Sequence, residues 1–149
     1  MGKIKLKYEQ LIKALGQLER SIINFEKIDQ YPENIGIIDK EDLFLALRES
    51  MIQRFEFNVD LFWKYVKRYI EEEMKKSIEF NSPRTVIREA CRIKLIPEED
   101  SQEIMKMIDA RNMTSRIYKE EVADQISSKV SDYYQLMRKY SKKLVPNKN

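Results

Sequence analysis

The sequence predicts an all-α fold, an up-and-down four-helix bundle with one additional short helix. Apolar residues recur at steps of three and four over long stretches, which is the period of an amphipathic helix. Only three glycines and four prolines occur among 149 residues, so few turns are available. Long helices joined by short connections pack mostly antiparallel. We therefore expect a single helical bundle domain over residues 1–149, which is long enough to bury a core without disulfides or metal.

The first predicted helix carries one clean apolar stripe with Lys, Glu, Gln and Arg on its other face. Gly16 lies inside this stripe, where it weakens the helix slightly. The stretch Tyr31–Gly36 contains Pro32, breaks the pattern and is predicted to be a loop. The residues of the stripe are Ile4, Tyr8, Leu11, Leu15, Leu18, Ile22 and Phe25.

The second predicted helix is the longest. Asp39 is the expected N-cap, and the helix is expected to run to about Lys76, because no proline or glycine occurs in that stretch. Apolar residues cover most of its circumference, which is typical of a central helix or of a face shared with another subunit. We interpret it as the core helix of the bundle and expect a dimer to form through its broad apolar face. They are Phe44, Leu47, Met51, Phe55, Val59, Phe62, Val66 and Tyr69, with Ile52, Phe57, Leu61, Trp63, Tyr65 and Ile70 as a second set.

Three further helices follow. Ser82 before Pro83 is a strong start signal for a short helix, and Pro97 followed by acidic residues starts the next one. Residues 111–118 interrupt the periodicity, and residues 145–149 are expected to form a frayed tail. The last helix carries Val122, Ile126, Val130, Tyr133, Met137, Tyr140 and Leu144 in regular steps.

Composition excludes several classes of function. The single cysteine, Cys91, rules out an intramolecular disulfide and fits a cytoplasmic protein. The chain has no histidine, so zinc sites built from His and Cys are excluded, and no metal or cofactor is expected. No secretory signal or apolar run long enough to span a bilayer is present. The net charge of +3 permits contact with RNA but does not argue for it.

Polar residues in two segments are not explained by core packing. In the long helix, Arg54 and Glu56 lie among aromatic residues, where long charged side chains must pair or reach solvent. The alternative is a solvated strip of Glu56, Asp60 and Lys64, with Asp60 and Lys64 as an ion pair one turn apart.

The second segment, residues 111–118, brings two arginines, an amide, hydroxyls and a phenol between two helices. Arginine offers a planar fork of donors that matches phosphate, and Asn112 can contact a base or a backbone. Free backbone N–H groups at the start of the last helix would add affinity for an anion. The alternative is a capped interhelical turn whose arginines pair with surface acids.

Three groups of residues, taken in order over roughly residues 11–144, are similar to one family: the nucleotidyltransferase substrate-binding proteins, a HEPN-domain group. Each motif alone is moderately specific, and their common order and spacing carry the resemblance. The groups are Arg54-Phe55-Glu56-Phe57 with Trp63-Lys64, Ser82-Pro83-Arg84 with Ile87-Arg88-Glu89-Ala90, and Asp109-Ala110-Arg111-Asn112 with Thr114-Ser115 and Tyr118.

The resemblance implies a HEPN-like bundle, commonly a homodimer, that is paired with a minimal nucleotidyltransferase encoded nearby. In several such pairs the HEPN protein is a toxin with metal-independent ribonuclease activity and the nucleotidyltransferase is its antitoxin. The toxin motif is Arg, four residues, His, one residue, Tyr. Its Arg corresponds to Arg111 and its Tyr to Tyr118, but its His position holds Arg116.

This departure decides between two functions. Arginine stays protonated, so Arg116 can bind phosphate but cannot transfer a proton as histidine does. We therefore expect a partner subunit that binds a nucleotide or another phosphate-bearing ligand, or RNA. The alternative is a ribonuclease toxin with a degenerate motif. In the toxin-antitoxin members of the family the partner enzyme attaches a nucleotide to the tyrosine of the motif, so the resemblance implies that Tyr118 can accept one; the other interpretation of Tyr118 is an ordinary half-buried tyrosine. The candidate site residues are Arg111, Asn112, Ser115, Arg116, Tyr118, Arg54 and Glu56.

Overall fold

The computed structural model describes residues 2–79 and 81–147. Within these residues the chain forms five α-helices, two 3-10 turns and one small hairpin, which confirms the predicted all-α bundle with one additional short helix. The helices are α1 (Gly2–Glu26), α2 (Lys40–Glu72), α3 (Pro83–Arg92), α4 (Glu98–Asn112) and α5 (Glu120–Lys143); the 3-10 turns are η1 (Ile28–Gln30) and η2 (Thr114–Arg116); the strands are β1 (Asn34–Ile35) and β2 (Ile38–Asp39).

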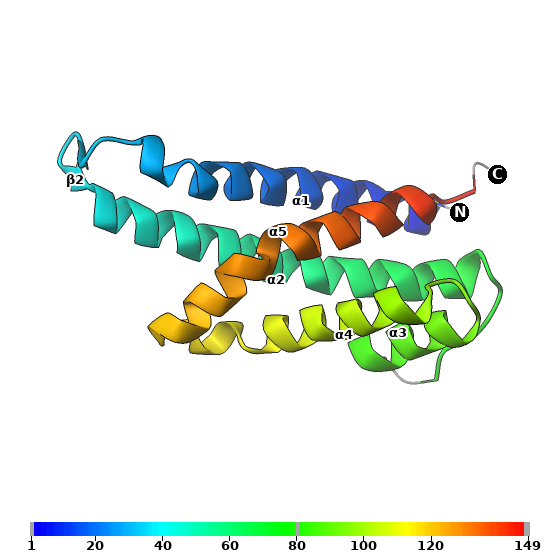
Figure 1. Cartoon of the computed structure of the whole chain (residues 1–149). Coiled ribbons are helices and arrows are strands. Elements are labelled where there is room, and N and C mark those ends of the chain that lie inside the picture. Colours follow the sequence, from blue (N-terminus) through cyan, green and yellow to red (C-terminus); the bar gives the residue numbers. More distant parts are fainter. Residues whose placement is uncertain (1, 80, 148–149) are drawn as a thin grey trace.

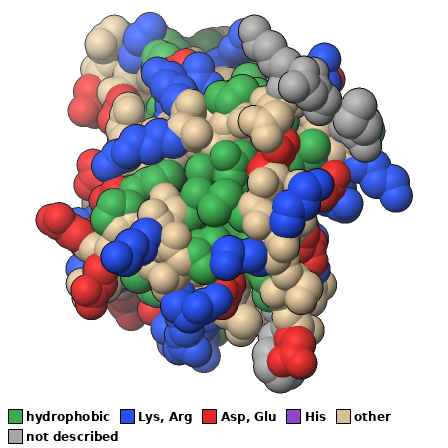
Figure 2. All heavy atoms as spheres, turned by 90° about the vertical axis from the view of Figure 1, so that its right-hand side faces the viewer, with side chains coloured by type: hydrophobic (Ala, Val, Ile, Leu, Met, Phe, Trp, Pro, Cys, Tyr) green, Lys and Arg blue, Asp and Glu red, His purple; other side chains and the backbone are tan. Residues whose placement is uncertain are grey.

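The four long helices alternate in direction (Figure 1). α1 and α2 lie side by side over most of their length, α4 runs back along the second half of α2, and α5 crosses α2 obliquely to end beside the start of α1. Both chain termini therefore lie at the same end of the molecule, and the hairpin lies at the other end. Figure 2 views the end with the termini, where Lys and Arg side chains surround a hydrophobic patch.

The predicted helix starts are confirmed by their caps. The Asp39 carboxylate accepts a hydrogen bond from the backbone N–H of Asp42 at 2.8 Å, and this satisfies one free donor in the first turn of α2. The Ser82 hydroxyl accepts from the N–H of Thr85 at 3.3 Å, and Pro83 follows as the first residue of α3.

The long helix ends at Glu72, four residues before the predicted end. The backbone turns left-handed at Lys75, where φ is 56°, and the N–H of Lys76 donates to the carbonyl of Ile70 at 3.2 Å. This bond closes the helix end in the way that glycine usually allows. Because a lysine occupies the position, the sequence carried no signal for the end of the helix.

The stretch predicted as a loop at Tyr31–Gly36 contains more order than expected. Asn34 pairs with Asp39 and Ile35 with Ile38 in a two-residue antiparallel hairpin. Gly36 has a φ of 63° and supplies the left-handed turn residue that such a short connection needs.

The C-terminal segment leaves α5 after Lys143, close to residue 145, where the predicted tail begins. The backbone N–H of Asn147 donates to the Glu73 carboxylate at 2.9 Å and so lies against the end of α2. Residues 148–149 of the predicted tail lie outside the described residues.

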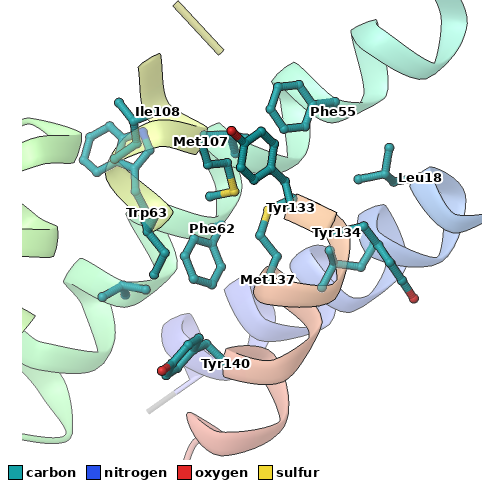
Figure 3. Close-up of a cluster of buried hydrophobic side chains, with 14 of the residues drawn as sticks. Leu18, Phe55, Phe62, Trp63, Met107, Ile108, Tyr133, Tyr134, Met137 and Tyr140 are labelled. Atoms are coloured by element: carbon teal, nitrogen blue, oxygen red, sulfur yellow. The ribbon is translucent and has the colours of Figure 1, made fainter. Parts of the chain in front are cut away.

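α2 is the central helix of the bundle, as predicted. Most of its apolar residues are buried by other helices of the same chain. Figure 3 shows Phe55, Phe62 and Trp63 of α2 meeting side chains of α1, α4 and α5 in one cluster. The residues labelled with these three are Leu18, Met107, Ile108, Tyr133, Tyr134, Met137 and Tyr140.

Among the described residues no helix is long and apolar enough to cross a membrane.

Candidate functional site

The start of the connection between α4 and α5 is attached to α2. The guanidinium of Arg111, in the last turn of α4, donates two hydrogen bonds to Asp60, from Nε to Oδ1 at 2.8 Å and from Nη2 to Oδ2 at 3.0 Å. Its third nitrogen, Nη1, lies 3.6 Å from the Glu56 carboxylate. The buried Thr114 hydroxyl also donates to Glu56 and lies 2.8 Å from the Arg111 carbonyl oxygen. Two carboxylates of α2 thus fix the end of α4.

The connection is attached to α2 a second time where α5 begins. Arg48 is 4% exposed, and its guanidinium donates to both carboxylate oxygens of Glu120, at 2.7 and 3.0 Å, and to Asp124 at 3.1 Å. The same guanidinium lies over the ring of Phe44, 5.3 Å from its centre. Arg48 and Asp60 are twelve residues apart on α2, about 18 Å along the helix axis. The two attachments therefore hold residues 113–119 alongside α2.

Between the two attachments the predicted site residues face solvent. Asn112 ends α4, Ser115 and Arg116 lie in η2, and Tyr118 follows in the turn before α5. All four are exposed, and Tyr118 is 77% exposed, which is exceptional for an aromatic side chain in this chain. The structure thus brings Asn112, Ser115, Arg116 and Tyr118 to one short exposed segment.

The ion pairs also set the protonation of their members. Hydrogen bonding to Asp60 raises the pKa of Arg111, and the Arg48 guanidinium lowers the pKa of Glu120. Arg111 and Glu120 are therefore charged near neutral pH.

Arg54 is the predicted site residue that the structure does not bring to this segment. Its guanidinium donates to the backbone carbonyl of Gln17 at 2.9 Å and so connects α2 to α1. Arg54 and Glu56 are two residues apart on a helix and therefore point to nearly opposite sides. Glu56 contributes to the site as a partner of Thr114 and Arg111, and Arg54 contributes to packing between helices.

Sequence reasoning missed or misassigned three residues. The expected pair of Asp60 with Lys64 is wrong, because the Asp60 carboxylate binds Arg111 instead. Arg48 was not singled out, and Thr114 was named only within a motif, although these two residues fix the two ends of the exposed segment. A charged residue inside the apolar run of residues 43–47 and 51–52 is the one signal that could have indicated Arg48.

The arrangement limits what each arginine can bind. Arg111 faces two carboxylates, so this cluster carries a net negative charge and its fork of donors is already occupied. Arg116 is exposed, and no carboxylate of the described residues lies within 4.0 Å of it. Among the described residues no group of three or more His, Cys, Asp or Glu side chains could hold a metal ion. Of these two arginines, Arg116 is therefore the one whose donors remain available to an anion.

Known proteins share both the sequence and the fold of this chain. A Haemophilus influenzae protein named "Probable ribonuclease HepT" is 26% identical over 131 residues, which is 87% of this chain and 85% of that protein. A crystal structure of a Thermus thermophilus protein is 27% identical, with a TM-score of 0.71 over 91% of this chain and 99% of the other.

A second Haemophilus influenzae structure, described as revealing the fold of a substrate binding domain of a nucleotidyltransferase, shares the fold. It has a TM-score of 0.76 at 22% identity and covers 93% of this chain and 99% of the other. Residues 6–146 match the family described as "Nucleotidyltransferase substrate binding protein like". With nearly the whole chain matched, this protein belongs to the nucleotidyltransferase substrate-binding protein family.

Proposed function

We propose that this chain is the partner subunit of a separately encoded minimal nucleotidyltransferase and that it presents Tyr118 and Arg116 to that enzyme. The observation that carries the proposal is the exposed segment between α4 and α5. All eight tyrosines lie in the described part of the chain, and Tyr118 is exposed whereas the others are buried or half-buried. An exposed phenol beside free cations has the properties expected of a side chain that must enter another protein's active site.

The chemistry that this segment fits is transfer of a nucleoside monophosphate. The phenol oxygen of Tyr118 would bond to the α-phosphorus of a nucleoside triphosphate held by the partner. The bond from that phosphorus to the bridging oxygen of the β-phosphate would break, and pyrophosphate would leave with the electron pair. A base of the partner would take the phenol proton. Arg116 would bind the phosphates, since its guanidinium is exposed and matches their geometry.

A nucleotide or another phosphate-bearing ligand would therefore contact Arg116, Ser115 and Asn112 before it contacts Arg111. Arg111 already donates to Asp60 and lies near Glu56, so its role is to hold the end of α4. This proposal assigns Arg111 and Glu56 to positioning, and it assigns the exposed residues to binding.

Complex formation tests the partnership. Co-expressed with the nucleotidyltransferase encoded nearby, the chain is expected to co-purify with it through size exclusion. Arg116→Glu should weaken the complex, because it reverses charge in the centre of the exposed segment. Lys129→Glu, an equal charge change at an exposed residue of α5, is the control and should have no effect. Absence of a nucleotidyltransferase in the neighbouring reading frame, or of any complex, would refute the partnership.

The second candidate function is a metal-independent ribonuclease toxin, and a specific observation favours it: the relative named "Probable ribonuclease HepT". Against it stands the absence of histidine, because proton transfer by a positioned group contributes roughly 10²–10⁴ to such a rate. Arg116 cannot supply that transfer.

We expect the purified chain to leave RNA intact in the presence of EDTA and its induction alone to leave bacterial growth unchanged. Gel analysis of RNA over time is the measurement. Cleavage in EDTA that disappears in Arg116→Ala would overturn this prediction and establish the ribonuclease instead.

We also propose a homodimer, which the resemblance implies, and assign it to the hairpin end of the molecule. Most apolar residues of α2 are buried within one chain, so the long helix offers little further surface to a second copy. The hairpin instead exposes Ile35, Ile37 and Ile38 together, an apolar patch that a second copy could cover.

Mass measured by light scattering tests the homodimer. The expected mass is twice the 18.0 kDa of one chain, and Ile37→Asp with Ile38→Asp should reduce it to one chain. Leu6→Asp is the control, because Leu6 is exposed on α1 outside the hairpin. A single-chain mass for the unmodified protein at all concentrations would refute the dimer.

A further inference from the structure

We propose that a basic pocket between α1 and the second half of α2 binds a phosphate group. The pocket has a volume of about 190 Å³ and faces the outside of the bundle. One of its residues is acidic and four are cationic, from two helices and the segment before α3. They are Lys7, Lys64, Lys67, Arg68, Glu71 and Asn81.

Among the described residues, carboxylates near the pocket pair with two of its four cations and leave the other two uncompensated. Lys67 lies 3.8 Å from Glu71, and Arg68 lies 3.2 Å from Glu72, which is outside the pocket lining. In residues 2–79 and 81–147, no carboxylate lies within 4.0 Å of the Lys7 or Lys64 ammonium. The Lys64 ammonium lies over the Trp63 ring, 5.8 Å from its centre, a contact that brings no compensating negative charge. The four cations of the lining thus outnumber the two carboxylates that pair with them, and like charges brought together are stabilised by an anion between them.

Partial burial strengthens the attraction. The side chains of Lys67 and Arg68 are 23% and 35% exposed, so their charges are screened less by water than those of ordinary surface residues. The ion pairs with Glu71 and Glu72 also hold Lys67 and Arg68 in place beside the pocket.

The residue types and the volume select the phosphate group among anions. Arginine matches the tetrahedral oxygens with a fork of donors, lysine adds point charges, and the Asn81 amide can donate a further hydrogen bond. Pockets that enclose a whole drug-sized ligand measure about 300–1,000 Å³. The smaller pocket here would hold a phosphate group and leave the rest of the ligand outside. The shared chemistry is thus a phosphate, carried either by a free nucleotide or by a polynucleotide backbone.

This pocket is separate from the segment at Tyr118. Lys64 follows Asp60, the partner of Arg111, by one helical turn, about 6 Å along the axis, and the other cations lie farther toward the end of the molecule that holds the termini. Lys and Arg side chains are prominent at that end (Figure 2). The inference goes beyond the proposed function and does not depend on it.

Calorimetric titration tests the pocket with three probes at fixed ionic strength: sodium tripolyphosphate, ATP and a short single-stranded RNA. Lys7→Glu combined with Lys64→Glu should weaken binding by at least about tenfold, because two charge-assisted contacts are lost. The matched control, Arg20→Glu combined with Lys129→Glu, changes the net charge equally at exposed residues of α1 and α5 and should change binding less than about twofold.

The probes distinguish the source of the phosphate. Equal binding of tripolyphosphate and ATP, lost in the pocket variant, supports the site and assigns it to free nucleotides. Binding of RNA alone, lost in the same variant, supports the site and assigns it to a polynucleotide backbone. No binding of any probe, or an equal loss in the control variant, overturns the proposal. Circular dichroism melts of each variant, together with the milder Lys7→Gln and Lys64→Gln pair, separate lost binding from lost folding.

Discussion

Replacing Phe55 by alanine is expected to lower the free energy of unfolding by about 3–5 kcal/mol. The Phe55 side chain is 0% exposed and stacks on Tyr133 of α5, with ring centres 5.8 Å apart and planes at 23°. It lies on the central helix, where Figure 3 shows it among residues of the shared cluster. Truncation would remove its burial from water and leave a cavity that the surrounding rigid helices can fill only partly.

The next aromatic residue of the same helix provides the matched control. Phe57 is 57% exposed, so Phe57→Ala should change the free energy of unfolding by less than about 0.5 kcal/mol. Urea unfolding followed by circular dichroism measures both variants, with equal slopes showing that the same surface is exposed on unfolding. Equal losses at the two positions would contradict the placement of α2 in the core.

The contrast between Phe55 and Phe57 also shows what the sequence could predict. The three- and four-residue steps identified the helices, and local cap signals at Asp39 and Ser82 placed two helix starts correctly. These features depend on neighbours along the chain. Where the usual local signal is missing, as at Lys75 in place of glycine, the predicted helix end was wrong by four residues.

The candidate site was less accessible to sequence reasoning, because its geometry depends on contacts between distant segments. Arg111 and Asp60 are 51 residues apart, and Arg48 and Glu120 are 72 apart. Hydrophobic periodicity predicts which face of a helix is buried but not the register between two helices, so the acid that each arginine meets could not be deduced. The exposed segment itself was found because residue types and order along the chain resembled a family.

Tyr118→Phe is expected to abolish nucleotide attachment to this chain. In the presence of the co-expressed nucleotidyltransferase and nucleoside triphosphates, the unmodified protein should gain the mass of one nucleoside monophosphate, as measured by intact mass spectrometry. Phenylalanine keeps the ring and removes the oxygen that would bond to phosphorus, so no mass should be gained. Arg116→Ala should slow the reaction by roughly 10–100-fold, the value of one charge-assisted hydrogen bond to phosphate.

The control distinguishes a specific acceptor from any reactive phenol. Tyr31 is half-buried beside the hairpin, and Tyr31→Phe should accept the nucleotide as the unmodified chain does. Because Tyr118 is 77% exposed, its loss should leave the thermal midpoint unchanged, so that an absent mass gain reports chemistry rather than unfolding. Continued attachment of the nucleotide to Tyr118→Phe would show that another residue is the acceptor. If the unmodified chain gains no nucleotide with any of the common nucleoside triphosphates, the transfer to Tyr118 is refuted. The exposed phenol between the two ion-paired helix ends would then contribute only to binding of the partner.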